Sequence, residues 1–132
     1  MGSEYALHFS AREEEIADLL WDIGLMRNSA RVLTLMIKDV DLTSREIERV
    51  VDLRQPEVSS AITDLMKKRW IHIVLQITEN KGRPMKVYHI AKTLNEILDE
   101  LMDTLIGSYE QKFQDIERVR NLLHQKPVLT KF

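Results

Sequence analysis

Residues 43–71 read TSREIERVVDLRQPEVSSAITDLMKKRWI and contain two short helical patterns separated by a break. The first pattern begins at a capping box, in which the Thr43 hydroxyl caps the helix and Glu46 reaches back to the Thr43 backbone. Residues 52–55 interrupt the pattern, and Pro56 restarts a helix in its first turn, where proline is best tolerated. Two short helices joined by a tight turn predict a helix-turn-helix.

The second helix, predicted over residues 56–69, has one apolar and one polar face. Its apolar stripe consists of Val58, Ala61, Ile62, Leu65 and Met66. The outer face carries Gln55, Glu57, Ser59, Ser60, Thr63 and Lys67. Short hydroxyl and amide side chains allow a helix to lie deep in a major groove and to bond base edges or phosphates. The alternative is an ordinary solvated helix face.

A predicted β-hairpin follows this helix. Apolar residues at 71, 73, 75 and 77 alternate with the residues between them, which predicts a strand with one buried face. Asn80–Pro84 is a turn signal, and Met85–Ile90 reads as the returning strand. His72 and His89 are expected to be cross-strand neighbours, but two histidines without a third ligand at fixed spacing do not predict a metal site.

The hairpin tip, within residues 78–86, carries positive charge and is expected to act as a wing. Arg83 is the candidate for a narrow minor groove, which attracts guanidinium groups. Lys81 and Lys86, together with Lys67 and Lys68 on the preceding helix, are expected to contact phosphates.

The segment from Val58 through Leu65 to Ile71, followed by Gly82-Arg83-Pro84 and Tyr88, resembles the winged helix of MarR-like and TrmB-like transcription regulators, the latter mainly archaeal. The resemblance covers residues 25–92. Relatives usually carry Gly where Arg69 stands. Either Arg69 therefore adopts a left-handed conformation at some cost, or the helix ends differently.

Two further helices are expected outside the winged helix. Ser10 to Glu13 forms a second capping box, and its helix is expected to stop at Gly24. The apolar stripe of this helix is Ile16, Leu19, Leu20 and Ile23. The resemblance to MarR-like proteins implies that this helix packs into a dimer interface. Trp21 fits either such an interface or the core, of which the core is favoured, and Asn28 is expected to cap the next helix.

From Thr93 to His124 apolar residues recur at three- and four-residue steps, which predicts one long helix. Its candidate dimerisation residues are Leu98, Leu101, Met102, Leu105, Tyr109, Phe113 and Ile116. A stripe of this length exceeds what one small winged helix can cover, so part of it must be buried by another chain or by the N-terminal helix. A dimerising helix is the favoured prediction. The alternative is a helical hairpin that folds back at Gly107.

The sequence therefore predicts a mainly α fold with a small antiparallel hairpin: an N-terminal helix (1–24), a winged helix-turn-helix (25–92), a long C-terminal dimerisation helix (93–124) and a tail (125–132). The net charge of the 132 residues is −2. Residues 53–92 nevertheless carry eight Lys or Arg against three acids, or +5, and the remainder carries 11 against 18, or −7. Positive charge thus gathers where the motif predicts nucleic acid.

No stretch is long and apolar enough to span a membrane, and cysteine is absent, which suits a cytoplasmic protein. There is no nucleophile motif, glycine-rich phosphate loop or HExxH, so we expect neither an enzyme nor a cofactor. The main hypothesis is a homodimeric regulator that binds double-stranded DNA at a pseudo-palindromic site. The resemblance to MarR-like proteins implies a possible small-molecule effector between the winged helix and the dimer helices. The alternative is a winged-helix module that binds other proteins.

Overall fold

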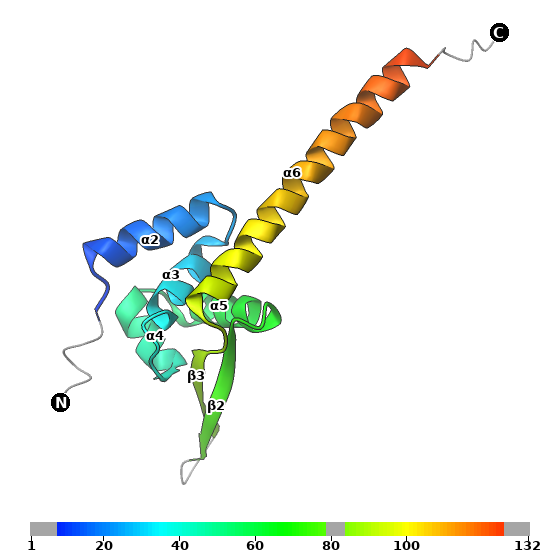
Figure 1. Cartoon of the computed structure of the whole chain (residues 1–132). Coiled ribbons are helices and arrows are strands. Elements are labelled where there is room, and N and C mark those ends of the chain that lie inside the picture. Colours follow the sequence, from blue (N-terminus) through cyan, green and yellow to red (C-terminus); the bar gives the residue numbers. More distant parts are fainter. Residues whose placement is uncertain (1–7, 79–83, 126–132) are drawn as a thin grey trace, which may run out of the picture. The chain divides into compact units, whose positions relative to one another are not determined.

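The computed structural model describes residues 8–78 and 84–125. Its contacts divide the chain into two compact units, Met1–Leu94 and Asn95–Phe132. The fold is mainly helical with a small antiparallel sheet, and it is a winged helix-turn-helix, as predicted (Figure 1).

The first unit contains, in chain order, α2 (Ala11–Asp22), α3 (Arg27–Met36), β1 (Leu42–Thr43), α4 (Ser44–Val51), α5 (Gln55–Lys67), β2 (Ile71–Thr78) and β3 (Pro84–Ile90). The strand order is β1-β3-β2, and both pairings are antiparallel. β1 was not predicted, because a strand of two residues is too short to show alternation.

Helix α3 forms the centre of the first unit. Every residue from Ser29 to Met36 is buried, and the helix packs against α2, α4 and α5. Burial on all sides means that its polar side chains need partners within the protein. The Thr34 hydroxyl donates to the Ala30 carbonyl at 2.7 Å. All described buried side-chain nitrogen and oxygen atoms have a hydrogen-bond partner.

Arg31 is buried in α3 and connects three elements. Its Nη1 donates to the Glu14 carboxylate on α2 at 2.6 Å, and its Nε and Nη2 donate to the Val51 carbonyl at the end of α4. The guanidinium also lies 4.6 Å from the centroid of the Phe9 ring. A planar guanidinium with five donors can satisfy all of these partners at once, which a lysine cannot.

Both capping boxes of this unit are confirmed. The Glu13 backbone N–H donates to Ser10 Oγ at 3.3 Å, and the Ser10 backbone N–H donates to the Glu13 carboxylate at 3.0 Å. The same reciprocal pair joins Thr43 and Glu46 at 3.3 and 2.9 Å. Each box satisfies amide donors that the helix itself leaves without acceptors. The two helix starts are therefore determined locally.

The predicted stop of α2 at Gly24 is confirmed, because Gly24 has a φ of +120° and the Leu25 N–H donates back to the Leu20 carbonyl. The predicted cap at Asn28 is wrong. After this tight reversal α3 begins at Arg27, with Met26 at the N-cap and without a side-chain cap. Asn28 therefore lies inside the first turn.

The predicted apolar stripe of α2 is only partly buried. Leu20 is buried together with Ala17, whereas Leu19 and Ile23 are exposed. The assignment of Trp21 to the core is wrong, since 49% of its surface is exposed and the Arg27 guanidinium lies 5.7 Å from its ring centroid.

Helix α5 ends slightly earlier than predicted, with Lys68 as its C-cap. Arg69 adopts the left-handed conformation, with a φ of 62°, and the Trp70 N–H donates to the Leu65 carbonyl. This resolves the two alternatives in favour of a left-handed residue where relatives carry glycine. Met66 was assigned to the buried stripe but is exposed, since the buried face comprises Val58, Ala61, Ile62 and Leu65.

The prediction of one continuous buried face on β2 is wrong because the strand contains a bulge. Ile73 pairs with Tyr88 and Leu75 with Val87, so Val74 is an extra residue. An extra residue moves the following side chains to the other face of the sheet. Ile71 is buried, whereas Leu75 and Ile77 beyond the bulge are exposed.

The second unit contains all of α6 (Leu94–His124) except its first residue, and the sequence predicted this helix at nearly the same bounds. The helix is continuous through Gly107, so the alternative of a helical hairpin is wrong. Ile97 and Leu101 are buried, and most of the remaining apolar side chains are exposed. Among residues 8–78 and 84–125, no helix has the combination of length and apolar character that crossing a bilayer requires.

Candidate nucleic-acid interface

Helix α5 presents a polar face to solvent. The four residues of its buried stripe fix one side of the helix in the core, where they pack against α3 and α4. The opposite side exposes five of the six residues that the sequence assigned to this face, namely Gln55, Ser59, Ser60, Thr63 and Lys67, whereas Glu57 is half-buried. The structure thus places all five on one accessible surface of a helix whose other side is anchored.

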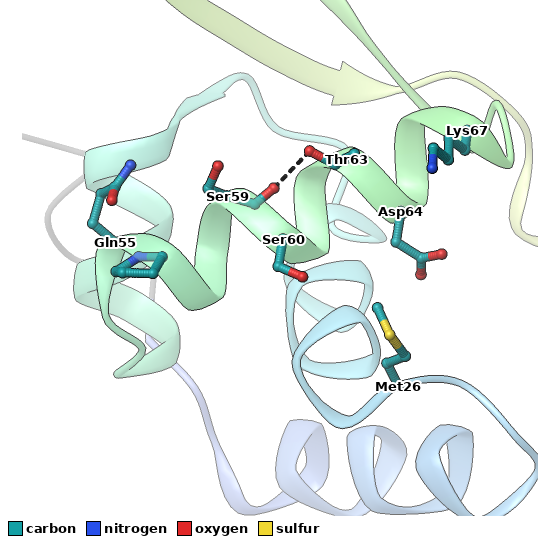
Figure 2. A pocket seen from close by; sticks show the side chains of 8 residues that line it. Met26, Gln55, Ser59, Ser60, Thr63, Asp64 and Lys67 are labelled. Carbon is teal, nitrogen blue, oxygen red and sulfur yellow. Dashed lines mark hydrogen bonds between the residues drawn. The ribbon is translucent and has the colours of Figure 1, made fainter.

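These five residues line a groove with a volume of about 690 Å³ (Figure 2). Three further residues complete its lining: Met26, Pro56 and Asp64. Sequence reasoning missed them for different reasons. Asp64 follows Thr63 in sequence but was not assigned to the polar face of the helix, and Pro56 was considered only as a helix start. Met26 comes from the start of α3, which no local pattern connects to α5.

The hydroxyl of Thr63 is already committed as a donor. Thr63 Oγ1 donates to the Ser59 carbonyl one helical turn earlier, at 2.9 Å (Figure 2). Its oxygen lone pairs remain able to accept. In a major groove this side chain would therefore suit an amino donor, such as that of adenine or cytosine, better than a base acceptor.

Asp64 is the acidic residue of the groove, and it is held by two donors. The buried Ser29 hydroxyl donates to Asp64 Oδ2 at 2.7 Å, and Lys68 Nζ donates to Oδ1 at 2.6 Å. Burial by itself would raise the pKa of Asp64, but these two hydrogen bonds and the positive charges of Lys68 and Lys67 outweigh it and lower the pKa. The carboxylate therefore stays ionised and connects α3 to α5.

Lys68 was predicted to contact phosphate, and in the structure its exposed ammonium also has partners within the protein. Besides its bond to Asp64, it lies 5.8 Å from the centroid of the Trp70 ring. The neighbouring Lys67 is exposed and lines the groove. Of the two lysines, Lys67 is the better placed to meet a phosphate.

On the hairpin, Lys86 is exposed on β3 and pairs with Gln76 of β2. The two predicted tip residues, Lys81 and Arg83, lie outside the described residues. The described part of the hairpin therefore supplies one of the three cations that the sequence assigned to the wing.

His72 and His89 are directly opposite each other on β2 and β3, as predicted. His89 also contacts two carboxylates that the sequence did not connect with it: Nδ1 lies 2.5 Å from Asp41, and Nε2 lies 2.7 Å from Asp39. These contacts attach the segment before β1 to the base of the hairpin. Within residues 8–78 and 84–125 no group of three potential metal ligands has the geometry to hold an ion.

The comparisons with known proteins bear on the fold. No protein-family model and no curated protein match the sequence. A solved structure described as a possible transcriptional regulator from Methanosarcina mazei Go1 has a TM-score of 0.59 and 15% identity, over 80% of this chain and 86% of that one. The chain therefore shares its fold with that protein.

Two further solved structures are less similar to this chain, with TM-scores below one half. A MarR family regulator from Neisseria meningitidis has a TM-score of 0.47 and 16% identity, over 83% of this chain and 84% of that one. The DNA complex of MepR from Staphylococcus aureus has a TM-score of 0.45 and 18% identity, over 85% and 90%.

Proposed function

We propose that this chain is a DNA-binding transcription regulator of the MarR-like or TrmB-like kind, which inserts α5 into a major groove. The observation that carries the proposal is the division of α5 into an anchored apolar side and an exposed side of short polar residues. Small hydroxyl side chains such as those of Ser59 and Ser60 keep the helix surface low, so that its backbone can approach base edges closely.

The charge distribution supports the same proposal. The +5 charge of residues 53–92 coincides with α5 and the hairpin, while the chain as a whole is negative. A local positive surface attracts the phosphate backbone even when the net charge is unfavourable. Phosphate contacts would come from Lys67 and from the hairpin cations, including Lys86 and, at the tip, Lys81 and Arg83.

The proposed regulator is a cytoplasmic homodimer that reads a pseudo-palindromic site, with half-sites about one helical turn or a multiple apart. The exposed apolar residues of α6 supply the surface through which two copies would associate. A small-molecule effector enters the proposal only through the resemblance to MarR-like regulators.

The test is fluorescence anisotropy of a labelled mixed-sequence duplex, titrated with protein at several salt concentrations. We expect binding at low salt, with log K falling against log salt at a slope of several units. Lys67→Ala should reduce the magnitude of this slope by about one, because one phosphate contact is lost.

The matched control is Arg12→Ala, which removes an exposed cation from α2. This variant should bind like the parent protein. An absence of binding at low salt, or equal effects of the two substitutions, would contradict the proposed role of α5.

A second candidate function is a protein-interaction module, and the exposed apolar side chains of α6 favour it. In that case Lys67→Ala on α5 would not affect association with the partner, whereas substitutions on α6 such as Phe113→Asp would abolish it. The two candidates therefore predict opposite sensitivities for α5 and α6.

A further inference from the structure

The exposed side of α6 contains a regular apolar seam. Met102, Tyr109, Ile116 and Leu123 recur every seven residues, and each exposes more than half of its surface. Residues seven apart lie almost on one line along a helix, with a drift of about 20° per repeat. We call these four residues the α6 seam.

Further apolar side chains widen the seam on both sides. Leu98, Leu105 and Val119 lie about 40–60° to one side of it, and Ile106 and Phe113 lie about 40–60° to the other, given 100° per residue. Seven-residue spacing over four repeats is the pattern by which one helix packs along another. The seam therefore has the geometry of a helix-pairing surface.

Charge is distributed unequally between the two halves of α6. Residues 94–109 contain four acids and no base, so their charge is −4. Residues 110–124 contain three acids and three bases, and their charge is zero with histidine neutral. The acids of the amino half are Glu96, Asp99, Glu100 and Asp103, and the bases of the carboxyl half are Lys112, Arg118 and Arg120.

We propose that α6 pairs with α6 of a second copy of this chain in antiparallel orientation. A parallel pair would bring the −4 half of each helix against the −4 half of the other, and like charges at close range oppose association. An antiparallel pair brings each −4 half against the half that contains all three bases. This proposal rests on the homodimer of the proposed function and adds its orientation.

The register with the greatest overlap has a clear centre. The residue midway between Leu94 and His124 is Tyr109, which belongs to the α6 seam. A two-fold axis through this point brings the same side of both helices together. Arg120 and Asp99 lie on the same side of the seam, eleven residues after and ten residues before Tyr109.

Arg120 of one copy therefore approaches Asp99 of the partner subunit. Among the residues that the structure describes, Arg120 forms one exposed ion pair, with Glu117 of its own helix at 3.3 Å. An exposed ion pair of this kind is weak and can exchange. The guanidinium is thus able to turn toward the partner helix.

The absence of cysteine allows the orientation to be measured with a single introduced label. Asn121→Cys, an exposed position on α6, would be spin-labelled in the full chain, and the distance between labels measured by double electron–electron resonance. Asn121 lies twelve residues from Tyr109, so the antiparallel pair places the two labelled positions about 36 Å apart along the helix axis, at 1.5 Å per residue. A parallel pair would leave no separation along the axis, so that only the spacing across the pair would remain, with helix axes about 10 Å apart.

Ser108→Cys is the matched control, because it lies at the centre of the helix and gives a short distance in either orientation. We expect a long distance for the Asn121 label and a short one for the Ser108 label. Short distances for both, or no dipolar coupling for either, would overturn the proposal.

Anisotropy with duplex DNA, measured on the same labelled proteins, separates this inference from the proposed function. DNA binding combined with short distances for both labels would support the proposed DNA-binding function and contradict the antiparallel pair. A long distance for the Asn121 label and a short one for the Ser108 label, without DNA binding, would support the antiparallel pair and contradict the DNA-binding function.

Discussion

Arg31 illustrates how a charged residue becomes part of a core. It occupies a buried position in α3, and its guanidinium is satisfied by the Glu14 carboxylate and the Val51 carbonyl. A buried charge without such partners would be costly, whereas a fully bonded one can join several elements. Here the bonds connect α2 and the end of α4 to the central helix that also supports α5.

Ser29 has a similar role toward α5, which leads to a prediction about stability. Ser29→Ala removes the buried hydroxyl that donates to the Asp64 carboxylate. Hydrogen bonds to charged groups contribute more than neutral ones, so we expect a loss of about 1–3 kcal/mol in the free energy of unfolding. Urea denaturation followed by circular dichroism measures this change.

The control is Ser60→Ala, which removes an exposed hydroxyl from α5 itself. Its effect should be within about 0.5 kcal/mol, as for most surface substitutions. Equal stabilities for the two variants would show that the Ser29 bond contributes nothing.

The Glu13 carboxyl provides a pH-dependent prediction. Hydrogen bonds from the Ser10 hydroxyl and backbone lower the pKa of Glu13 from 4.5 to about 2, with a smaller contribution from Lys38. Because folding lowers this pKa, the stabilisation by the capping box is complete above pH 4.5 and is lost as the pH falls through about 2. In Ser10→Ala the pKa of Glu13 should return toward its ordinary value.

Carboxyl titration by NMR measures that shift directly. Glu46 in the same variant serves as an internal reference, since its capping box with Thr43 is unchanged. An unaltered Glu13 pKa in Ser10→Ala would exclude the box as the cause.

At the scale of elements, the end of α5 is set by Arg69 in a left-handed conformation, with a φ of 62°. A side chain costs roughly 1–2 kcal/mol in this conformation, and glycine avoids that cost at some loss of unfolded-chain entropy. We expect Arg69→Gly to raise the free energy of unfolding by about 0.5–1 kcal/mol. Thermal and urea denaturation test this expectation.

The control for Arg69→Gly is Ser60→Gly, at an exposed position in the middle of α5. Glycine is less favourable than serine inside a helix, so this variant is expected to lower the free energy of unfolding by roughly 0.5 kcal/mol. If both substitutions destabilised the protein, the left-handed residue could not be the source of the predicted gain.

The bulge at Val74 has a consequence for the hairpin as an element. It divides β2 into an inner part, where Ile71 is buried, and an outer part, where Leu75 and Ile77 are exposed. An increased local twist accompanies such bulges. The outer part of the hairpin is therefore set by its pairing with β3 rather than by core packing.

At the scale of the whole molecule, association should be visible as a concentration-dependent stability. If α6 pairs with a second copy, the midpoint of thermal unfolding rises with protein concentration. Phe113→Asp places a charge on the flank of the α6 seam and should abolish that dependence. Gln114→Asp adds the same charge on the opposite side of the helix and should preserve it.

Calorimetry and sedimentation at several concentrations measure both effects. A midpoint that is independent of concentration in the parent protein would remove the homodimer from the proposal. Leu101, one of the candidate dimerisation residues, is unsuitable for this test because it is already buried in the single chain.

Local chemistry made much of this fold predictable. The two capping boxes, the reversal at Gly24, Pro56 in the first turn of α5 and the period of α6 each act within a few residues, so the sequence states them directly. The exposed face of α5 followed from the same logic, because a buried stripe at helical spacing leaves the other side in water.

The tertiary structure decided what depends on residues distant in sequence. Met26 joins the α5 groove, Asp64 accepts a hydrogen bond from Ser29, and Trp21 is exposed, although no local pattern separates these outcomes from their alternatives. The bulge at Val74 likewise depends on the register with β3. Periodicity reports which side of an element is apolar, but only packing between elements determines how far along that side burial extends.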